Sequence, residues 1–148
     1  MRKKTTVAPM KKLVFIIEDD LSQQKMLQVH FEEALGAYEV RCFSNPEFML
    51  PHLTDKPFAV VLDHFFNDQT KTGLDYLTLL RKKYPSIPVI YYTTLNDESI
   101  KAQVMKLGAV QFILKDMASL VRLRTALDAI HEKENKRGFF AGLFRGLR

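Results

Sequence analysis

Five polar residues in this sequence each follow a short apolar run, and together they could hold a cation. The runs and the polar residues after them are 13–17 with Glu18 and Asp19, 58–62 with Asp63, 88–92 with Thr93, and 110–114 with Lys115. Three carboxylates that come close together repel one another unless positive charge lies among them. Mg²⁺ is a hard ion that takes oxygen ligands, typically one or two carboxylates with water and phosphate oxygens. These residue types therefore predict a magnesium site, provided that the fold brings the ends of the runs together.

The apolar runs alternate with segments of helical periodicity, which predicts an α/β fold. Strands are expected at residues 13–17, 38–43, 58–62, 88–92 and 110–114, each followed by a helix. These strands are apolar nearly throughout, as is typical of a sheet that helices cover on both faces. The alternation predicts right-handed crossovers and a single parallel sheet. Because open parallel sheets bind ligands beyond the carboxyl ends of their strands, the five polar residues are expected to converge there.

Local signals fix several helix ends. Gly36 and Gly108 follow helical segments and are expected to stop them. Pro46 suits the first turn of a helix, where its missing N–H costs little. Pro51 is expected to shorten or kink the same helix. Asp97 is a predicted N-cap for the segment after the fourth strand.

Length and composition favour one globular domain of the cytoplasm. The chain has 148 residues, of which 47% are apolar and 26% charged, in the range of a single compact domain. The single cysteine, Cys42, cannot form an internal disulfide, which favours a reducing compartment. No apolar run is longer than five residues, whereas a membrane span needs roughly 18. Secreted, disulfide-rich and transmembrane classes are therefore disfavoured.

The net charge of +5 comes from the two ends of the chain. Residues 1–12 hold five bases and no acid, residues 131–148 hold five bases and two acids, and residues 13–130 hold 12 bases and 15 acids. A groove for nucleic acid would place bases across a folded face, so nucleic acid is not an expected partner. We divide the chain into a basic extension (1–12), a central domain (13–131) and a basic amphipathic tail (132–148).

The tail carries an apolar stripe whose partner the sequence leaves open. Phe139, Phe140, Leu143, Phe144 and Leu147 recur at helical spacing with arginines on either side. Such a helix can lie on a membrane surface or in a groove of a partner protein. Folding back onto the domain and disorder are the other outcomes that residues 137–148 allow.

Four fragments of residues 13–130 resemble the receiver domain of bacterial two-component response regulators. They are VFIIEDD, AVVLD, PVIYYTT and GAVQFILKD, and they occur in the same order as in that family. The resemblance implies a flavodoxin-like (CheY-like) three-layer α/β/α sandwich with a five-stranded parallel sheet and five helices. Two other folds fit less well. A haloacid-dehalogenase phosphatase needs a second Asp where Phe65 stands, and a flavodoxin needs a Ser/Thr-rich loop after the first strand.

The resemblance also assigns a metal site. Glu18 and Asp19 match the acidic pair that holds Mg²⁺, and Asp63 matches the aspartate that is phosphorylated and also contacts the metal. Phe65, two residues further on, would supply a backbone carbonyl. The implied cofactor is Mg²⁺.

Three further positions match residues that bind the phosphoryl group or respond to it. Thr93 matches the residue whose hydroxyl binds a phosphoryl oxygen. Lys115 matches the lysine that forms an ion pair with the phosphoryl group. Phe112 stands at the switch-aromatic position. When Thr93 turns toward the phosphoryl group, it vacates space that the Phe112 ring can enter. The face of the fourth helix, fifth strand and last helix would change as a result.

The function implied is that of a single-domain response regulator. A histidine kinase or phosphotransfer protein would phosphorylate Asp63, and output would pass by contact with a downstream protein, since little sequence follows Ile130. The only chemistry expected is Mg²⁺-dependent self-phosphorylation and dephosphorylation at Asp63, not that of an ordinary enzyme. Whether phosphorylation drives dimerisation stays open. The alternative is a pseudo-receiver, a protein-binding module that does not depend on phosphorylation.

Two departures from the family pattern have consequences. The segment DHFFNDQTKTG lacks the usual Met-Pro and is two residues longer than usual before its glycine. Phe65 and Leu95 are bulky where the family tunes loss of phosphate, which predicts slow self-dephosphorylation. Asp116 replaces the proline that usually follows Lys115, so a cis or a trans bond is open at this point.

Overall fold

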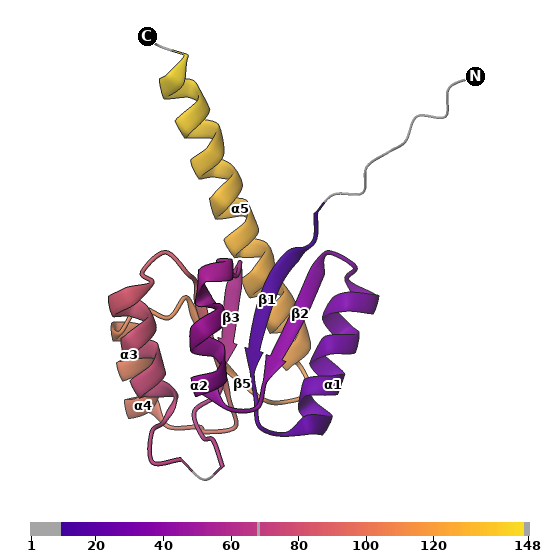
Figure 1. The fold of residues 1–148 in the computed structure, drawn as a ribbon, viewed down its shortest axis with the longest axis vertical. Helices are drawn as coiled ribbons and strands as arrows, with labels where there is room; N and C mark the ends of the chain where they lie inside the picture. Colours follow the sequence, from indigo (N-terminus) through magenta and orange to yellow (C-terminus); the bar gives the residue numbers. More distant parts are fainter. Residues whose placement is uncertain (1–9, 68, 147–148) are drawn as a thin grey trace, which may run out of the picture.

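A computed structural model describes residues 10–67 and 69–146, and it has a parallel sheet at its centre (Figure 1). The five strands are ordered β2-β1-β3-β4-β5. Their bounds are Lys12–Ile17 (β1), Tyr38–Phe43 (β2), Ala59–Leu62 (β3), Val89–Thr93 (β4) and Gln111–Leu114 (β5). All pairings are parallel. The predicted CheY-like α/β fold is confirmed.

Helices cover both faces of the sheet. They are α1 (Leu21–Val29) with the π-helical turn η1 (His30–Ala34), α2 (Pro46–Met49) with the 3₁₀ segment η2 (Leu50–Asp55), α3 (Gly73–Lys83), α4 (Glu98–Lys106) and α5 (Ser119–Arg145). One buried cluster joins α1 and α5 to the sheet, and a second joins α2, α3 and α4 to its other face. Alternate residues of β1 belong to the two clusters, Val14 to the first and Phe15 to the second. This two-sided burial explains why the strands are apolar nearly throughout.

Most helix ends follow the predicted local signals. Asp97 caps α4 by accepting a hydrogen bond from the backbone N of Ile100 at 3.0 Å. Pro46 lies in the first turn of α2, and the helix changes to 3₁₀ geometry at Leu50, next to Pro51. The bond between Lys115 and Asp116 is trans, since the described residues contain no cis peptide bond.

Two helices differ from the simplest expectation. The first does not stay α-helical to residue 35, because its last turn is η1, closed by a bond from the N of Leu35 to the carbonyl of His30 at 3.2 Å. The last continues without a break across residues 131 and 132 and ends at Arg145. Beyond Ile130, α5 extends past the sheet on the side where β1 begins (Figure 1).

Part of the predicted end segments lies outside the described residues. This holds for residues 1–9 of the basic extension and residues 147–148 of the tail. No helix within the described ranges is long and apolar enough to cross a membrane. The division of the chain at residues 12 and 131 stays a prediction.

Candidate functional site

Residues from the ends of three strands meet in one ion-paired cluster. The ammonium Nζ of Lys115, after β5, donates to Oε2 of Glu18 at 2.5 Å and to Oδ2 of Asp63 at 2.6 Å. Glu18 follows β1 and Asp63 follows β3. All three side chains are almost fully buried. The convergence predicted from the strand ends is present for these residues.

An acidic pocket opens above this cluster. It is lined by four carboxylates and one ammonium, those of Glu18, Asp19, Asp20, Asp63 and Lys115. Phe65 and Thr94 also line it. The carboxylates outnumber the ammonium, so the pocket attracts cations when its acids are ionised.

Hydrogen bonds hold the loops around the pocket. Oδ2 of Asp19 accepts from the backbone N of Asn67 at 2.8 Å, which joins the loop after β1 to the loop after β3. Asp20 caps α1 by accepting from the N of Gln23 at 2.9 Å. Of the two neighbouring acids, Asp20 therefore serves the helix, whereas Asp19 lies between the two loops.

Burial and pairing shift the protonation of the cluster. Burial raises the pKa of Glu18 to about 7, against the opposing effect of the Lys115 ammonium. Burial disfavours the charged form of Lys115, but its hydrogen bonds to Asp63 and Glu18 outweigh this and raise its pKa. Lys115 is therefore charged at neutral pH, and Glu18 titrates near neutrality.

Thr93 lies at the same sheet edge but does not line the pocket. Its side chain is fully buried, and its Oγ1 accepts from the backbone N of Leu95 at 3.1 Å. The adjacent Thr94 lines the pocket instead. Thr93 is thus buried beneath the surface of the pocket, and its neighbour Thr94 forms the lining at this point.

Phe112 stacks against a buried tyrosine. Its ring lies 5.8 Å from the ring of Tyr91 on the neighbouring strand β4, at an interplanar angle of 15°. Phe112 also lines a shallow pocket with Glu98 and Lys101 of α4 and Arg122 of α5. The side chain at the predicted switch position therefore reaches the surface between α4 and α5.

Residues 14–128 match the family model of the response regulator receiver domain. The chain belongs to this family. Nodulation protein W of Bradyrhizobium diazoefficiens is 33% identical to this receiver domain over 132 residues, which cover 89% of this chain and 56% of the relative. Transcriptional regulatory protein FlgR of Helicobacter pylori is 33% identical over 102 residues, 69% of this chain and 25% of that protein. The receiver domain thus spans about half, or less, of these curated relatives.

Solved structures agree on the fold. The signal receiver domain of a repressor protein from Vibrio parahaemolyticus superposes with a TM-score of 0.75 at 19% identity, covering 88% of this chain and 98% of that one. Chemotaxis response regulator CheY4 of Vibrio cholerae gives a TM-score of 0.68 at 18% identity, covering 80% and 99%. At these identities the likeness shows the architecture alone.

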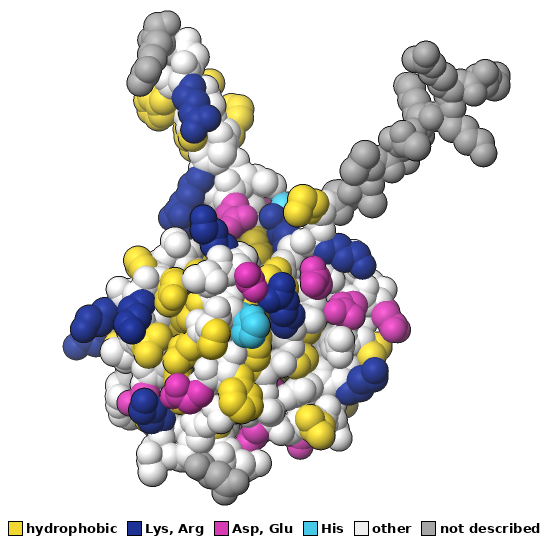
Figure 2. All heavy atoms as spheres, in the orientation of Figure 1, with side chains coloured by type: hydrophobic (Ala, Val, Ile, Leu, Met, Phe, Trp, Pro, Cys, Tyr) yellow, Lys and Arg dark blue, Asp and Glu magenta, His cyan; other side chains and the backbone are white. Residues whose placement is uncertain are grey.

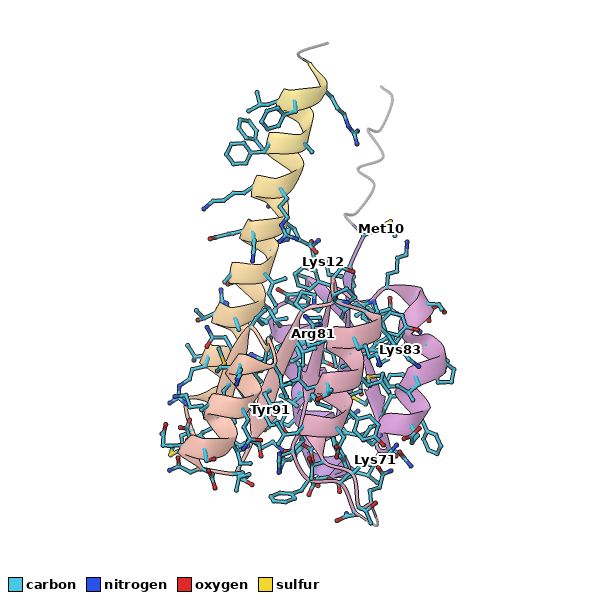
Figure 3. The ribbon with its side chains drawn as sticks, turned by 90° about the vertical axis from the view of Figure 1, so that its left-hand side faces the viewer. Met10, Lys12, Lys71, Arg81, Lys83 and Tyr91 are labelled. Carbon is cyan, nitrogen blue, oxygen red and sulfur yellow. The ribbon has the colours of Figure 1, made fainter. Side chains whose placement is uncertain are left out.

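The receiver domain has a buried polar pair that the sequence analysis did not include. The imidazole Nδ1 of His64 lies 2.5 Å from the hydroxyl of Tyr91, and both side chains are buried. Burial lowers the pKa of His64 and raises that of Tyr91, so both side chains are neutral near pH 7. The backbone N of His64 donates to Oδ1 of Asp63 at 2.6 Å. The pair thus connects the Asp63 loop to the Tyr91 ring, which stacks against Phe112 (Tyr91 is labelled in Figure 3).

Gly73 is a third residue that the sequence analysis did not include in the site. A Cβ at this position would lie 2.1 Å from the backbone oxygen of Asp63 and 2.6 Å from the hydroxyl of Tyr91. The N of Gly73 donates to the carbonyl of His64 at 2.8 Å. Its place at the end of the long loop indicated a helix start but not this contact, which depends on how α3 packs against the sheet.

The donor chemistry of the pocket fits a divalent cation, although the ligands are not assembled around a metal position. Within residues 10–67 and 69–146 no group of three His, Cys, Asp or Glu side chains is spaced to hold a metal ion. Instead, the Lys115 ammonium donates a hydrogen bond to one carboxylate oxygen of Glu18 and to one of Asp63. Asp19, Asp63 and Phe65 nevertheless line one pocket, whose carboxylate and carbonyl oxygens are the ligands that Mg²⁺ prefers.

Proposed function

We propose that this receiver domain takes a phosphoryl group on Asp63 from a histidine kinase or a phosphotransfer protein. The observation that carries the proposal is the Asp63 carboxylate, held by Lys115 in a pocket with more acids than bases. We infer that Glu18, Asp19, Asp63 and the Phe65 carbonyl hold Mg²⁺, which supplies positive charge for the incoming phosphate.

The chemistry is a nucleophilic displacement at phosphorus. A carboxylate oxygen of Asp63 forms the new P–O bond, while the P–N bond of the donor phosphohistidine breaks and its electron pair leaves with the imidazole. Lys115 is charged, and its ammonium lies against Asp63, where it neutralises charge on the transferred group. The phosphoryl group is lost by hydrolysis, in which water forms the new bond to phosphorus and the Asp63 carboxylate leaves, so the protein's own chemistry is confined to Asp63.

Output follows from the positions of Thr93 and Phe112. The Thr93 hydroxyl binds the N of Leu95 in the unphosphorylated protein, and the proposal requires it to turn to a phosphoryl oxygen. Phe112 then has space to move away from Tyr91. Because Phe112 lines the shallow pocket with Lys101 of α4 and Arg122 of α5, its movement changes the α4-β5-α5 face that a downstream protein would contact.

The test is incubation with acetyl phosphate and Mg²⁺, with phosphoprotein followed by gel shift. We expect a shifted species that is absent in Asp63→Asn and absent after chelation of Mg²⁺. Asp128→Asn, on the exposed surface of α5, is the matched control and keeps the shift. A shift that persists in Asp63→Asn, or none in the wild type, would favour the pseudo-receiver. The same samples, run by sizing chromatography, show whether phosphorylation drives dimerisation.

A further inference from the structure

We propose that this receiver domain attaches peripherally to anionic membrane surfaces through the end of α5. The apolar part of this surface is formed by Phe139, Phe140, Leu143 and Phe144, which are 65%, 56%, 50% and 73% exposed. At positions i, i+1, i+4 and i+5 these four side chains share one helix face. We call them the aromatic face.

The end of α5 is not packed against the core within the described residues, and Glu134 joins it to the domain by an ion pair with Lys12. Every residue from 131 to 146 is exposed, and the last core residue of the helix is Ile130. Isolated helices of this length are marginal in water, and Gly138 and Gly142 weaken this one further. A segment of this kind gains stability as a helix when its apolar face is covered.

The charged residues near the aromatic face indicate what kind of surface covers it. Residues 135–146 contain the bases Lys136, Arg137 and Arg145 and no acid, and all three are exposed. Bases beside aromatic and leucine side chains are typical of helices that lie in the headgroup layer of an anionic membrane. A second copy of this helix is a poorer partner, because the like charges would face one another.

The rest of the same pole carries further bases, beside the exposed acids Glu132 and Glu134. Lys12 pairs with Glu134 of α5 at 3.6 Å, so the chain enters β1 beside the projecting helix. Figure 3 shows Met10 and Lys12 at this end of the molecule, and Figure 2 shows basic side chains along the projection and at its base. Lys11 and Lys133 add further exposed bases there. The acidic pocket lies at the opposite end of the strands, where a bound membrane would leave it open to a phosphodonor.

The first test is co-sedimentation of the full chain with vesicles. We expect binding to phosphatidylcholine vesicles that contain phosphatidylglycerol and little binding to phosphatidylcholine alone. Replacing Phe139, Phe140 and Phe144 together by Ser should lower the affinity at least about tenfold, since burying even one such ring favours binding by that factor. Phe48→Ser, an equally exposed ring on α2, is the control and leaves binding unchanged.

The second test addresses charge. Arg137→Gln and Arg145→Gln should each weaken binding about fivefold, the effect of one base near an anionic surface. Lys82→Gln and Lys83→Gln, exposed on α3, should have no effect. Added salt should weaken wild-type binding, because it screens the attraction between exposed charges.

A spectroscopic test locates the contact. The chain contains no tryptophan, so emission from Phe140→Trp reports that position alone. We expect its emission to shift to the blue with phosphatidylglycerol vesicles, whereas Phe48→Trp stays unchanged.

Three results would overturn the proposal. They are absence of vesicle binding, binding that survives the triple phenylalanine replacement, and self-association that the same replacement abolishes. The last would assign the aromatic face to a second copy of the chain. Asp63→Asn should bind vesicles as the wild type does, so failure of the phosphorylation proposal and failure of this one are distinguishable.

Discussion

At the scale of single residues, Glu18 carries the strongest consequence, because it is a buried acid whose pKa is raised from 4.5 to about 7. Such a group binds more protons in the folded than in the unfolded chain at intermediate pH. The free energy of unfolding therefore falls as pH rises from about 4.5 to about 7. The loss is at most about 3.5 kcal/mol, since one pKa unit equals about 1.4 kcal/mol.

Glu18→Gln removes this titration. We expect its unfolding free energy to depend less on pH than that of the wild type between pH 4.5 and pH 7, as measured by urea denaturation without divalent ions. Glu39→Gln, on the exposed side of β2, should follow the wild type. Adding Mg²⁺ at pH 7 should stabilise the wild type more than Glu18→Gln, because bound metal favours the ionised carboxylate. Parallel pH curves for wild type and Glu18→Gln would contradict this assignment.

Phe65 determines a second prediction at this scale, for the phosphorylated protein. Its ring is 58% exposed, lines the acidic pocket and lies edge-on to the ring of His64 at 4.6 Å. We expect a bulky apolar ring at this position to keep the attacking water from an aspartyl phosphate on Asp63. Phe65→Asn should therefore lose phosphate several-fold faster in a time course after donor removal, whereas Phe48→Asn should match the wild type. An unchanged or slower loss in Phe65→Asn would show that the ring does not shield the phosphate.

The strand ends in the sequence predict part of this site and no more. The carboxyl ends of parallel strands share an edge, so Glu18, Asp63 and Lys115 are expected to lie together. The sequence pattern does not predict that Thr93 turns to the N of Leu95, because that choice depends on side-chain rotation. The hydrogen bond between His64 and Tyr91 joins the loop after β3 to the neighbouring strand β4, and residue spacing alone does not encode that contact.

At the scale of elements, the packing of α3 against β3 and β4 depends on the absence of a side chain at Gly73. A methyl group there would overlap the backbone oxygen of Asp63. Because the overlapping atom belongs to the backbone, no side-chain rotation can relieve the clash. Gly73→Ala should therefore destabilise the fold by about 1–3 kcal/mol and slow phosphorylation of Asp63. The measurements are urea denaturation and the acetyl phosphate assay.

Gly142→Ala is the matched control for this helix start. A Cβ at Gly142 meets nothing within 4 Å, and the residue lies inside α5. The Gly142→Ala replacement should stabilise α5 by about 0.5–1 kcal/mol. Equal effects of the two replacements would show that α3 can shift away from Asp63 at little cost.

Element types could be predicted more completely than element ends. Pro51 changes α2 to 3₁₀ geometry and Asp97 caps α4, because both effects are local to the residue. The π-helical turn at His30–Ala34 has no comparable local signal. For the tail, the sequence leaves a helix as one of several outcomes, because interior glycines disfavour it, and it does not predict that α5 continues unbroken to Arg145.

At the scale of the whole molecule, the receiver domain has two poles of opposite charge joined by α5. The helix begins near the carboxyl ends of the strands and ends beyond the side where β1 begins (Figure 1). The acidic pocket lies at the first of these ends and the exposed bases of α5 at the second. A phosphodonor and an anionic surface would thus approach from opposite ends. Phosphorylation and surface binding are expected to be independent unless the α4-β5-α5 face, which includes part of α5, is contacted at the same time.

The predicted boundary after residue 131 can be tested on stability. Residues 132–146 are all exposed, and their one ion pair to the described part of the domain is Lys12 with Glu134, which is largely exposed. Such pairs contribute about 0–1 kcal/mol, so a chain of residues 1–131 should unfold with a free energy within about 1 kcal/mol of the full chain. Its dependence on urea should be nearly the same, because the removed segment buries little surface. A loss above about 2 kcal/mol would mean that the end of α5 belongs to the folded domain.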